Sequence, residues 1–300
     1  MLDSFRERKL EVIEALGSLS DVARSVGAST LAERVDADLV KKLETDRFHL
    51  VVVGEFNHGK STFVNALLGQ AALPIGVTPT TAVIHHIVWA ESPSAKVVLA
   101  SGQEQPLPFD DVKSFATGGA RSDEPVSYVE VGFPADLLRE RIVLVDTPGV
   151  NDLSLTRAEI TYGYIPRSDA VLFVLDAGQP VKESERQFLE QQLIGKSREK
   201  IFFVVAKSDI WSPDERAEAL TYVRSRLGAL VKDPQVFAVS AQAALGGRVG
   251  ESGIRELVDH LMRFLAEERG RILLDNALGE GQSAAAVLGK VSQLSLYPDT

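Results

Sequence analysis

The stretch that most constrains the fold is FHLVVVGEFNHGKSTFVNALLG at residues 48–69. It begins with a β-branched apolar run typical of a buried strand and ends with residues typical of a helix. Between them, Gly54, Gly59, Lys60 and Ser61 match the pattern Gly, any four residues, Gly, Lys, then Ser or Thr. Glycines let successive backbone N–H groups point inward as an anion-binding nest, and the following helix adds its positive N-terminal end. The stretch therefore predicts a strand, a phosphate-binding loop and a helix.

The residues after this stretch alternate short β-branched runs with helical segments. Strands are expected at 48–53, 81–89, 96–99, 127–133, 141–145, 170–175, 200–205 and 235–239. Several of these runs are apolar throughout, which is typical of strands covered by helices on both faces. Residues 88–126 are rich in Ser, Gly, Pro and Asp, and we expect loops around extra strands there rather than a linker between domains. The pattern predicts an α/β fold with a mostly parallel, doubly wound central sheet.

Both ends of the chain have helical patterns. Leu10, Ile13 and Leu16 recur at helix spacing, and Ser29 or Thr30 is expected to cap a second helix. That second helix carries the apolar stripe Leu31, Val35, Leu39 and Leu43. Near the other end we expect a closing helix with the stripe Leu257, Leu261, Phe264 and Leu265, followed by another helical element with Val287, Val291 and Leu294.

Composition narrows the functional classes. The net charge of -10 disfavours nonspecific binding to nucleic acid or to an anionic lipid surface. The chain has no cysteine, which excludes disulfides and thiolate metal sites and fits a reducing cytoplasm. No apolar run approaches the roughly 18 to 20 residues of a membrane-spanning helix, and the N-terminus lacks a signal-peptide core. The histidines show no zinc-like spacing and are expected to be structural: His49, His58, His85, His86 and His260.

Residues in and beyond the predicted loop are suited to a nucleotide triphosphate. Lys60 is expected to reach the β- and γ-phosphates, and the Ser61 hydroxyl to ligate Mg²⁺. The sequence IVLVDTPG at 142–149 places Asp146 at the end of a buried strand, where its carboxylate would hold a magnesium-bound water. The Gly149 amide would bond the γ-phosphate, so that losing this phosphate releases the following loop.

A threonine-rich loop precedes the second expected strand. The sequence VTPTT at 77–81 offers Thr78, Thr80 and Thr81, any of which could close over Mg²⁺ with its hydroxyl. We favour Thr81, then Thr80. The alternative is that these threonines only begin a β-strand.

Base recognition is expected at AKSDI, residues 206–210, which follows an apolar strand. Asp209 can accept hydrogen bonds from guanine N1–H and N2–H₂, which adenine does not offer, while Lys207 lays its aliphatic stem along the ring. Ser240 and Ala241, at the end of another strand, would add a backbone N–H to guanine O6. The order of these motifs along the chain predicts GTP over ATP.

Four stretches together resemble those of the bacterial dynamin-like proteins, large GTPases of the dynamin superfamily. They are GEFNHGKSTFVNALLG, LPIGVTPTTAVI, LLRERIVLVDTPGV and LDAGQPVKESERQFLE, and the resemblance covers about residues 48–245. It implies an enlarged P-loop GTPase domain that hydrolyses GTP to GDP and phosphate, flanked by helices of a bundle. It also implies a homodimer that forms across the nucleotide face, and membrane remodelling.

The resemblance also implies a domain organisation. Residues 1–46 would be an N-terminal segment of the helical bundle, residues 47–268 the dynamin-type GTPase domain, and residues 269–300 the start of a further bundle segment that continues beyond the chain. Because the chain is acidic, lipid contact is expected in regions outside it. The expected location is the cytoplasm or the inner face of the membrane, and no nucleic-acid partner is expected.

Two positions depart from related GTPases. Ala206 stands where Asn or Thr usually precedes the lysine, so we expect a weaker tether to the base site and lower nucleotide affinity. Val150 stands where small GTPases place the glutamine that orients water, a residue that dynamin relatives also lack.

Two residues of the phosphate loop, Asn57 and His58, suggest roles beyond phosphate binding. Asn57 occupies the position where potassium-activated GTPases carry an asparagine that ligates a monovalent cation, so K⁺ or Na⁺ is a possible second cofactor beside Mg²⁺; the alternative is that it only stabilises the loop. His58 is expected at the rim of the site, either as a solvent-facing loop residue or as a contact to a paired domain.

The residues expected to bind GTP are Gly54, Glu55, Asn57, His58, Gly59, Lys60, Ser61, Thr62, Asp146, Gly149, Lys207, Asp209, Ser240 and Ala241. Those expected to act in catalysis are Lys60, Thr81, Thr80 and Asn57, and the Mg²⁺ ligands are Ser61, Thr81 and, through water, Asp146. Alternative functions are a slow GTP-gated interaction or scaffold module without a membrane role, and a ribosome-assembly GTPase. The latter is disfavoured because no basic extension follows the GTPase domain.

Overall fold

The structure is a computed structural model that describes residues 2–73, 83–112, 124–149, 164–165, 168–193 and 200–295. The chain divides into two compact units, which are described separately. Unit 1 comprises Met1–Phe48 and Arg263–Thr300, and unit 2 comprises His49–Met262.

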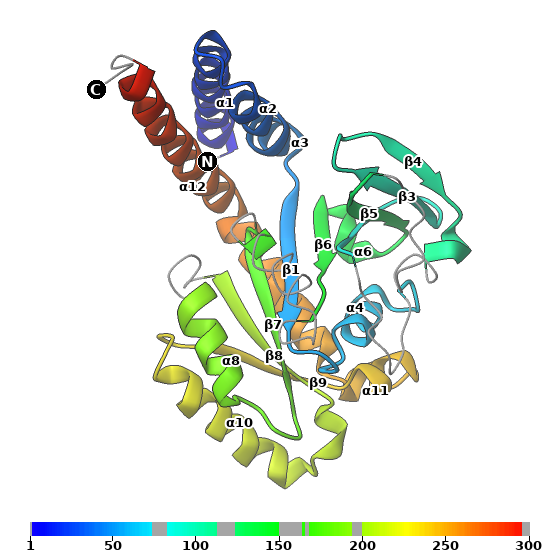
Figure 1. Ribbon diagram of the computed structural model, residues 1–300. Helices are drawn as coiled ribbons and strands as arrows, with labels where there is room; N and C mark the ends of the chain where they lie inside the picture. The colour runs from blue at the N-terminus through cyan, green and yellow to red at the C-terminus, as the bar shows by residue number, and fades with distance from the viewer. Residues whose placement is uncertain are drawn as a thin grey trace. The chain divides into compact units, whose positions relative to one another are not determined.

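Unit 2 is built around a nine-stranded sheet in the order β4-β3-β5-β2-β6-β1-β7-β8-β9 (Figure 1). Its strands are β1 Phe48–Gly54, whose first residue belongs to unit 1, β2 His85–Trp89, β3 Ser94–Leu99, β4 Glu104–Leu107, β5 Val126–Phe133, β6 Ile142–Asp146, β7 Ala170–Asp176, β8 Ile201–Ala206 and β9 Gln235–Val239. Strands β1, β7, β8 and β9 pair in parallel. The expected α/β fold with a mostly parallel central sheet is confirmed.

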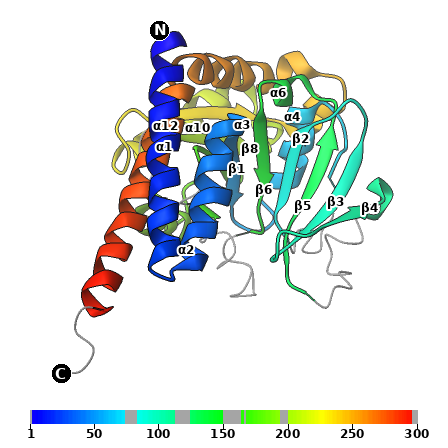
Figure 2. The ribbon, with the colours of Figure 1, turned by 90° about the horizontal axis from the view of Figure 1, so that it is seen from above.

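The other half of the sheet is mixed. Strand β2 pairs in parallel with β5 but antiparallel with β6, and β3 pairs antiparallel with both β4 and β5. Figure 2 shows β6, β2, β5, β3 and β4 following one another across this half. Strands β3 and β5 are the extra strands expected from the sequence, whereas β4 was not expected.

Helices cover both faces of the sheet, as the apolar strands require. They are α4 Lys60–Leu68, α6 Asp136–Arg139, α8 Glu183–Phe188, α10 Pro213–Gly228 and α11 Ala241–Leu245. On one face, Phe188 of α8 and Val223 of α10 join a core with alternate residues of the central strands, among them Val53, Phe173 and Phe203.

The opposite face is covered by α4, α11 and the start of a long helix, α12 Ile254–Ser295. There the ring of His260 lies 5.6 Å from that of Phe202 and 5.1 Å from that of Phe237. Figure 1 shows α8 and α10 on one side of the sheet and α4 and α11 on the other. Parallel strands buried in this way carry their loops at the sheet edges, where the motif residues lie.

Unit 1 is helical. Helix α1 spans Leu2–Ser25, and a second helical run comprises α2 Ser29–Arg34, a π-helical stretch Val35–Val40 and α3 Lys41–Thr45. Two details differ from expectation. The residue before α2 is Ala28 with no side-chain cap, so neither Ser29 nor Thr30 caps this helix. Leu10 is 66% exposed, because the buried stripe of α1 follows Val12, Leu16 and Ala23 instead.

Helix α12 continues through the region where a new helical element was expected. It runs without interruption for 42 residues, so residues 269–295 extend the closing helix rather than start another. In unit 1, a Cβ at Gly281 would lie 2.8 Å from Leu16 Cδ2, which shows how closely α1 and α12 approach. Lys9 also pairs with Asp46 at 2.7 Å.

Among the described residues, none of the helices combines the length and apolar character required to cross a membrane.

Candidate functional site

The motif residues of unit 2 gather where parallel strands end. Strand β1 ends at Gly54, β7 at Asp176, β8 at Ala206 and β9 at Val239. The carboxyl ends of adjacent parallel strands meet at one edge of a sheet, which is the usual place for a ligand in an α/β fold. The loop after β1 and the segments after β7 and β8 contact one another directly at this edge.

The loop between β1 and α4 depends on backbone conformations that favour glycine. Gly54 has φ of 154° and Gly59 has φ of 82°. A Cβ at Gly54 would lie only 2.5 Å from the carbonyl oxygen of Val174, so β1 and β7 approach here more closely than another residue allows. Asn57 also has a positive φ, of 64°, in the left-handed region that asparagine tolerates better than most residues.

Lys60 lies at the start of α4 with its ammonium group inside this loop. Its Nζ donates to the carbonyl oxygens of Gly54 at 3.0 Å and Glu55 at 2.9 Å. The side chain is buried, and Thr62 follows partly buried in the first turn of the helix. A buried cation beside the amides of a left-handed loop and a helix N-terminus makes a strongly anion-binding environment.

Ser61, in the first turn of α4, lies beside Asp146 at the end of β6. The Ser61 hydroxyl donates to Asp146 Oδ2 at 2.9 Å, and Asp146, the last residue of β6, is 1% exposed. A hydroxyl and a carboxylate held side by side are hard oxygen ligands of the kind that Mg²⁺ prefers. The pair therefore fits the expected magnesium site.

The segment after β6 packs against the loop. Thr147 Oγ1 donates to Val52 O at 2.8 Å, which fixes the start of this segment on β1. A Cβ at Gly149 would lie 2.9 Å from the backbone of Phe56 and 3.2 Å from Lys60 Nζ. The glycine therefore allows its backbone to approach the lysine ammonium, where a γ-phosphate would be expected.

Lys207 joins the expected base site to the phosphate loop. It has φ of 60°, and its Nζ donates to Asn57 O at 2.8 Å and to Asp176 Oδ2 at 2.5 Å. Burial opposes ionisation of the Asp176 carboxyl, but the hydrogen bonds from Lys207 and from the Gly178 backbone N–H, together with the charge of Lys207, outweigh it and hold the pKa below its ordinary value. The lysine stem thus crosses the loop, with its Cε 3.9 Å from the position of a Cβ on Gly59.

The other residues of the expected base site lie at the ends of β8 and β9. Asp209 is exposed, and its Oδ1 accepts from the buried Ser240 hydroxyl at 2.6 Å. Ala241 begins α11, with Ser240 as its N-cap. Ala206 is buried as the last residue of β8. The structure thus brings Asp209 and Ser240 together across 31 positions of sequence.

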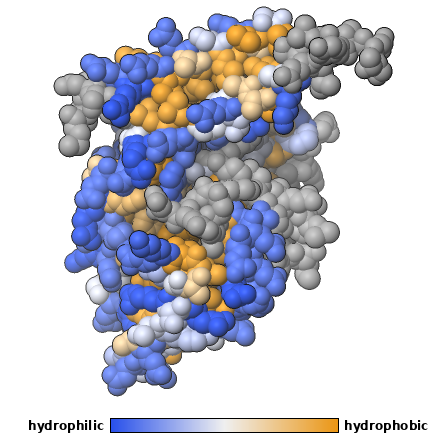
Figure 3. All heavy atoms as spheres, turned by 90° about the vertical axis from the view of Figure 1, so that its left-hand side faces the viewer, coloured by the Kyte–Doolittle hydropathy of each residue, from blue (hydrophilic) through white to orange (hydrophobic). Residues whose placement is uncertain are grey.

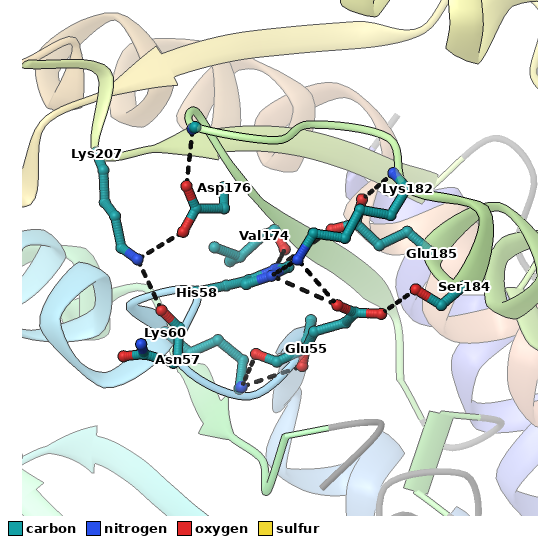
Figure 4. A network of polar contacts seen from close by, with 12 residues as sticks. Glu55, Asn57, His58, Lys60, Val174, Asp176, Lys182, Ser184, Glu185 and Lys207 are labelled. Carbon is teal, nitrogen blue, oxygen red and sulfur yellow. Dashed lines mark hydrogen bonds and ion pairs between the residues drawn. The ribbon is translucent and has the colours of Figure 1, made fainter. Parts of the chain in front are cut away.

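A second group of polar residues surrounds the far side of the loop, and its three members that follow β7 were not expected as part of the site. Its members are Glu55, His58, Lys182, Ser184 and Glu185 (Figure 4). Glu55 accepts from the Ser184 hydroxyl at 2.5 Å and from Lys182 Nζ at 3.4 Å. The only sequence signal for Lys182, Ser184 and Glu185 is the stretch LDAGQPVKESERQFLE, which carries the family resemblance but does not indicate contact with the loop.

The position of His58 corrects an expectation. The side chain was expected at the rim of the site, facing solvent or a partner, but it is 2% exposed. Burial lowers the pKa of His58 to about 4, so the imidazole is neutral at pH 7. A histidine enclosed by its own chain does not offer a surface to a paired domain.

Several expected residues lie outside the described residues: Thr78, Thr80, Thr81 and Val150. Of the other histidines, His85 and His86 are buried, and burial lowers the pKa of His85 to about 4. His86 stacks on Tyr128 with ring centroids 3.9 Å apart, in line with a structural role.

Comparison with known proteins identifies a family, two relatives in sequence and one in structure. The sequence profile of the dynamin family matches residues 50–208. An uncharacterized protein in the xynA 3′ region of Caldicellulosiruptor sp. is 33% identical over 267 residues, covering 85% of this chain and 65% of the relative. The bacterial dynamin-like protein of Nostoc punctiforme is 30% identical over 267 residues, covering 76% of this chain and 38% of the relative. The chain thus spans less than two thirds of the length of both relatives.

A solved structure shares the fold. It is described as an oligomerised bacterial dynamin pair that provides a mechanism for long-range sensing and tethering of membranes. The TM-score is 0.62 at 19% sequence identity, over 96% of this chain and 48% of that one.

Proposed function

The chain belongs to the dynamin family, and we propose that it binds GTP and hydrolyses it to GDP and phosphate. The observation that carries the proposal is the ammonium of Lys60 buried within a loop of left-handed glycine and asparagine residues, at the N-terminus of α4. This arrangement suits a triphosphate because the loop amides, the helix end and the lysine all favour negative charge.

The proposed preference for guanine rests on Asp209. Its carboxylate is exposed at the edge of the site and is held by Ser240, so it can accept from the N1–H and N2–H₂ groups of a guanine ring. Lys207 lies between this carboxylate and the phosphate loop, where its stem would support the ring. Adenine offers no matching pair of donors.

Mg²⁺ is the proposed metal cofactor, held by Ser61 and, through water, by Asp146. It would neutralise charge on the β- and γ-phosphates. Thr81, then Thr80, are the proposed further ligands, and these two residues lie outside the described part of the chain. Within the chain itself, the Asp146 carboxylate orients the Ser61 hydroxyl, which donates to Asp146 Oδ2 at 2.9 Å.

Asn57 is proposed to help place a monovalent cation beside the phosphates. It is exposed, and its left-handed backbone directs its carbonyl to Lys207. GTP turnover is then expected to be faster in K⁺ or Na⁺ than in a large inert cation. Equal turnover in all three would refute this role.

The test of the proposed activity is phosphate release from GTP in magnesium buffer. Wild-type protein is expected to release phosphate, and Lys60→Ala to lose nucleotide binding because the loop then lacks its cation. A Lys60→Ala variant with wild-type turnover would contradict the site. Lys232→Ala, a lysine outside the site on the segment before β9, serves as the control and is expected to behave as wild type.

Nucleotide-dependent homodimerisation and membrane remodelling form the wider part of the proposal. The family match and the fold shared with a membrane-tethering bacterial dynamin pair support it. Residues 1–46 and 269–300 are proposed as segments of a helical bundle that responds to the nucleotide. Contact with lipid is proposed for regions outside this chain, because its net charge of -10 opposes an anionic surface.

A slow GTP-gated scaffold is the alternative function. It is favoured by Ala206, a buried methyl side chain where a polar tether would strengthen nucleotide binding. The dependence of turnover on protein concentration separates the two proposals. A rate per molecule that rises with concentration supports dimer-dependent hydrolysis, whereas a slow and constant rate supports the scaffold.

A further inference from the structure

The segment that begins α8 reaches the phosphate loop through two side chains of that loop. Lys182 Nζ lies 3.4 Å from Glu55 Oε2 and 3.3 Å from His58 Nε2. Glu185 Oε1 lies 3.3 Å from His58 Nδ1, and Glu185 Oε2 accepts from the Lys182 backbone N–H at 2.7 Å. Figure 4 shows the imidazole of His58 lying between these groups and the carbonyl of Val174.

The neighbours of His58 define its tautomer. Val174 O, 3.3 Å from Nδ1, can only accept a hydrogen bond, and Lys182 Nζ, close to Nε2, can only donate one. Nδ1 therefore carries the hydrogen and Nε2 accepts. In this form the neutral ring links strand β7 to the lysine of the α8 segment.

A bound metal is the competing explanation for this cluster. Glu55, His58 and Glu185 are the three residues of the cluster that could offer metal ligands, and their ligand atoms lie within 4.8 Å of one another. However, Glu185 faces Nδ1 of the imidazole while Glu55 faces Nε2, so one ring nitrogen does not meet both carboxylates. The Lys182 ammonium already contacts Glu55 and His58. The charge and the geometry fit a lysine-centred network.

We propose that Lys182 and Glu185 are positioning residues for nucleotide binding, which hold the phosphate loop in its binding conformation through Glu55 and His58. The inference rests on the proposed GTPase function. The loop is held from both sides, by Lys207 at the Asn57 carbonyl and by Lys182 and Glu185 at the side chains of Glu55 and His58. The segment after β7 thus has a role in addition to capping α8.

Holding the loop reduces the conformational freedom that nucleotide binding would otherwise remove. Loss of Lys182 leaves the Glu55 carboxylate with one fewer cationic partner and His58 Nε2 without its donor. A loosened loop weakens both ground-state and transition-state binding of the phosphates, which raises KM more than it changes kcat.

The test compares Lys182→Met and Lys182→Arg with wild type in GDP affinity, GTP turnover and hydrogen exchange of residues 54–59. We expect Lys182→Met to weaken GDP binding and raise KM about tenfold, with kcat changed less than threefold and faster exchange in the loop. Lys182→Arg, which keeps the charge and the donors, is expected to recover most of the affinity. Glu185→Gln tests the second residue, with a smaller expected loss because the amide still accepts a hydrogen bond.

Lys96→Met is the matched control. Lys96 also pairs with two glutamates, Glu104 at 2.9 Å and Glu130 at 3.1 Å, on strands remote from the loop in sequence. Its substitution removes a comparable ion pair, and we expect GDP affinity and loop exchange to stay as in wild type.

The outcomes separate the inference from the function on which it rests. Wild-type protein that binds no guanine nucleotide would overturn the proposed function. Unchanged loop exchange in Lys182→Met would overturn the inference whether or not nucleotide binds, as would wild-type GDP affinity in that variant. Binding of Zn²⁺ alone at micromolar concentration, lost in Glu185→Gln, would replace the lysine-centred network with a metal site.

Discussion

His58 and Glu185 approach to 3.3 Å, and burial moves their pKa values in opposite directions. Burial lowers the pKa of His58 to about 4 and raises the pKa of Glu185 to about 7, with Glu55 adding to the second shift and the Lys182 backbone N–H opposing it. Desolvation disfavours the charged form of each group, so the imidazole stays neutral and the carboxyl keeps its proton to an unusually high pH.

The raised pKa of Glu185 predicts a pH-dependent stability. Between pH 4.5 and about 7 the folded protein holds a proton that the unfolded chain has released, so folding becomes less favourable as pH rises through this window. Glu185→Gln removes this dependence. Denaturant titration with tryptophan fluorescence measures the free energy of unfolding of the variant and of wild type. The variant value minus the wild-type value is expected to rise by about 3 kcal/mol from pH 4.5 to pH 8.

Glu183→Gln is the control for this experiment, because Glu183 lies on the same helix with its side chain 62% exposed. Its difference from wild type is expected to stay constant over the pH range. A constant difference for Glu185→Gln as well would show that the buried carboxyl does not titrate in this way.

At the scale of elements, sequence patterns predicted the strands that are apolar and buried. Strand β4 was missed because EQPL is short, polar and contains Pro106, a composition that only an edge strand tolerates. The continuity of α12 was missed because two separate apolar stripes suggested two helices, whereas one helix of 42 residues carries both, with Gly281 where α12 approaches Leu16. Lys182 and Glu185 were missed because their contacts with the loop span more than 120 positions and follow no local motif.

The junction of β1 and the loop gives a prediction for Gly54. Gly54→Ala would place a Cβ 2.5 Å from Val174 O at a φ of 154°, so the loop or strand β7 must shift. We expect a loss of about 2 kcal/mol or more in the free energy of unfolding and a loss of nucleotide binding. Thermal unfolding and GDP titration would measure both.

Gly228→Ala provides the comparison, since a Cβ at this last residue of α10 meets nothing within 4 Å. Its stability is expected to be unchanged or slightly higher, because alanine favours the helix more than glycine. Equal behaviour of the two variants would refute the close approach of β1 and β7.

For the whole molecule, the residues of the candidate site lie in one unit, and the helices at the two ends of the chain form the other. The motif residues of the site lie in unit 2, and unit 1 is helical with apolar side chains exposed on α1 and α12, among them Leu10, Val22 and Val287. Figure 3 shows apolar residues gathered over the helices at the top of the view. The chain spans less than two thirds of the length of the two relatives compared above, so the role of these helices in a bundle is a proposal.

The central claim is that Lys60 binds the phosphates of the nucleotide and that Asp209 recognises guanine. Calorimetry with GDP, ADP and XDP in magnesium buffer tests it most directly. We expect wild-type protein to bind GDP and not ADP, and Asp209→Asn to lose GDP affinity and gain XDP affinity, because the amide matches xanthine in place of guanine. No heat with GDP for folded wild-type protein, or unchanged GDP affinity in Asp209→Asn, would contradict the account.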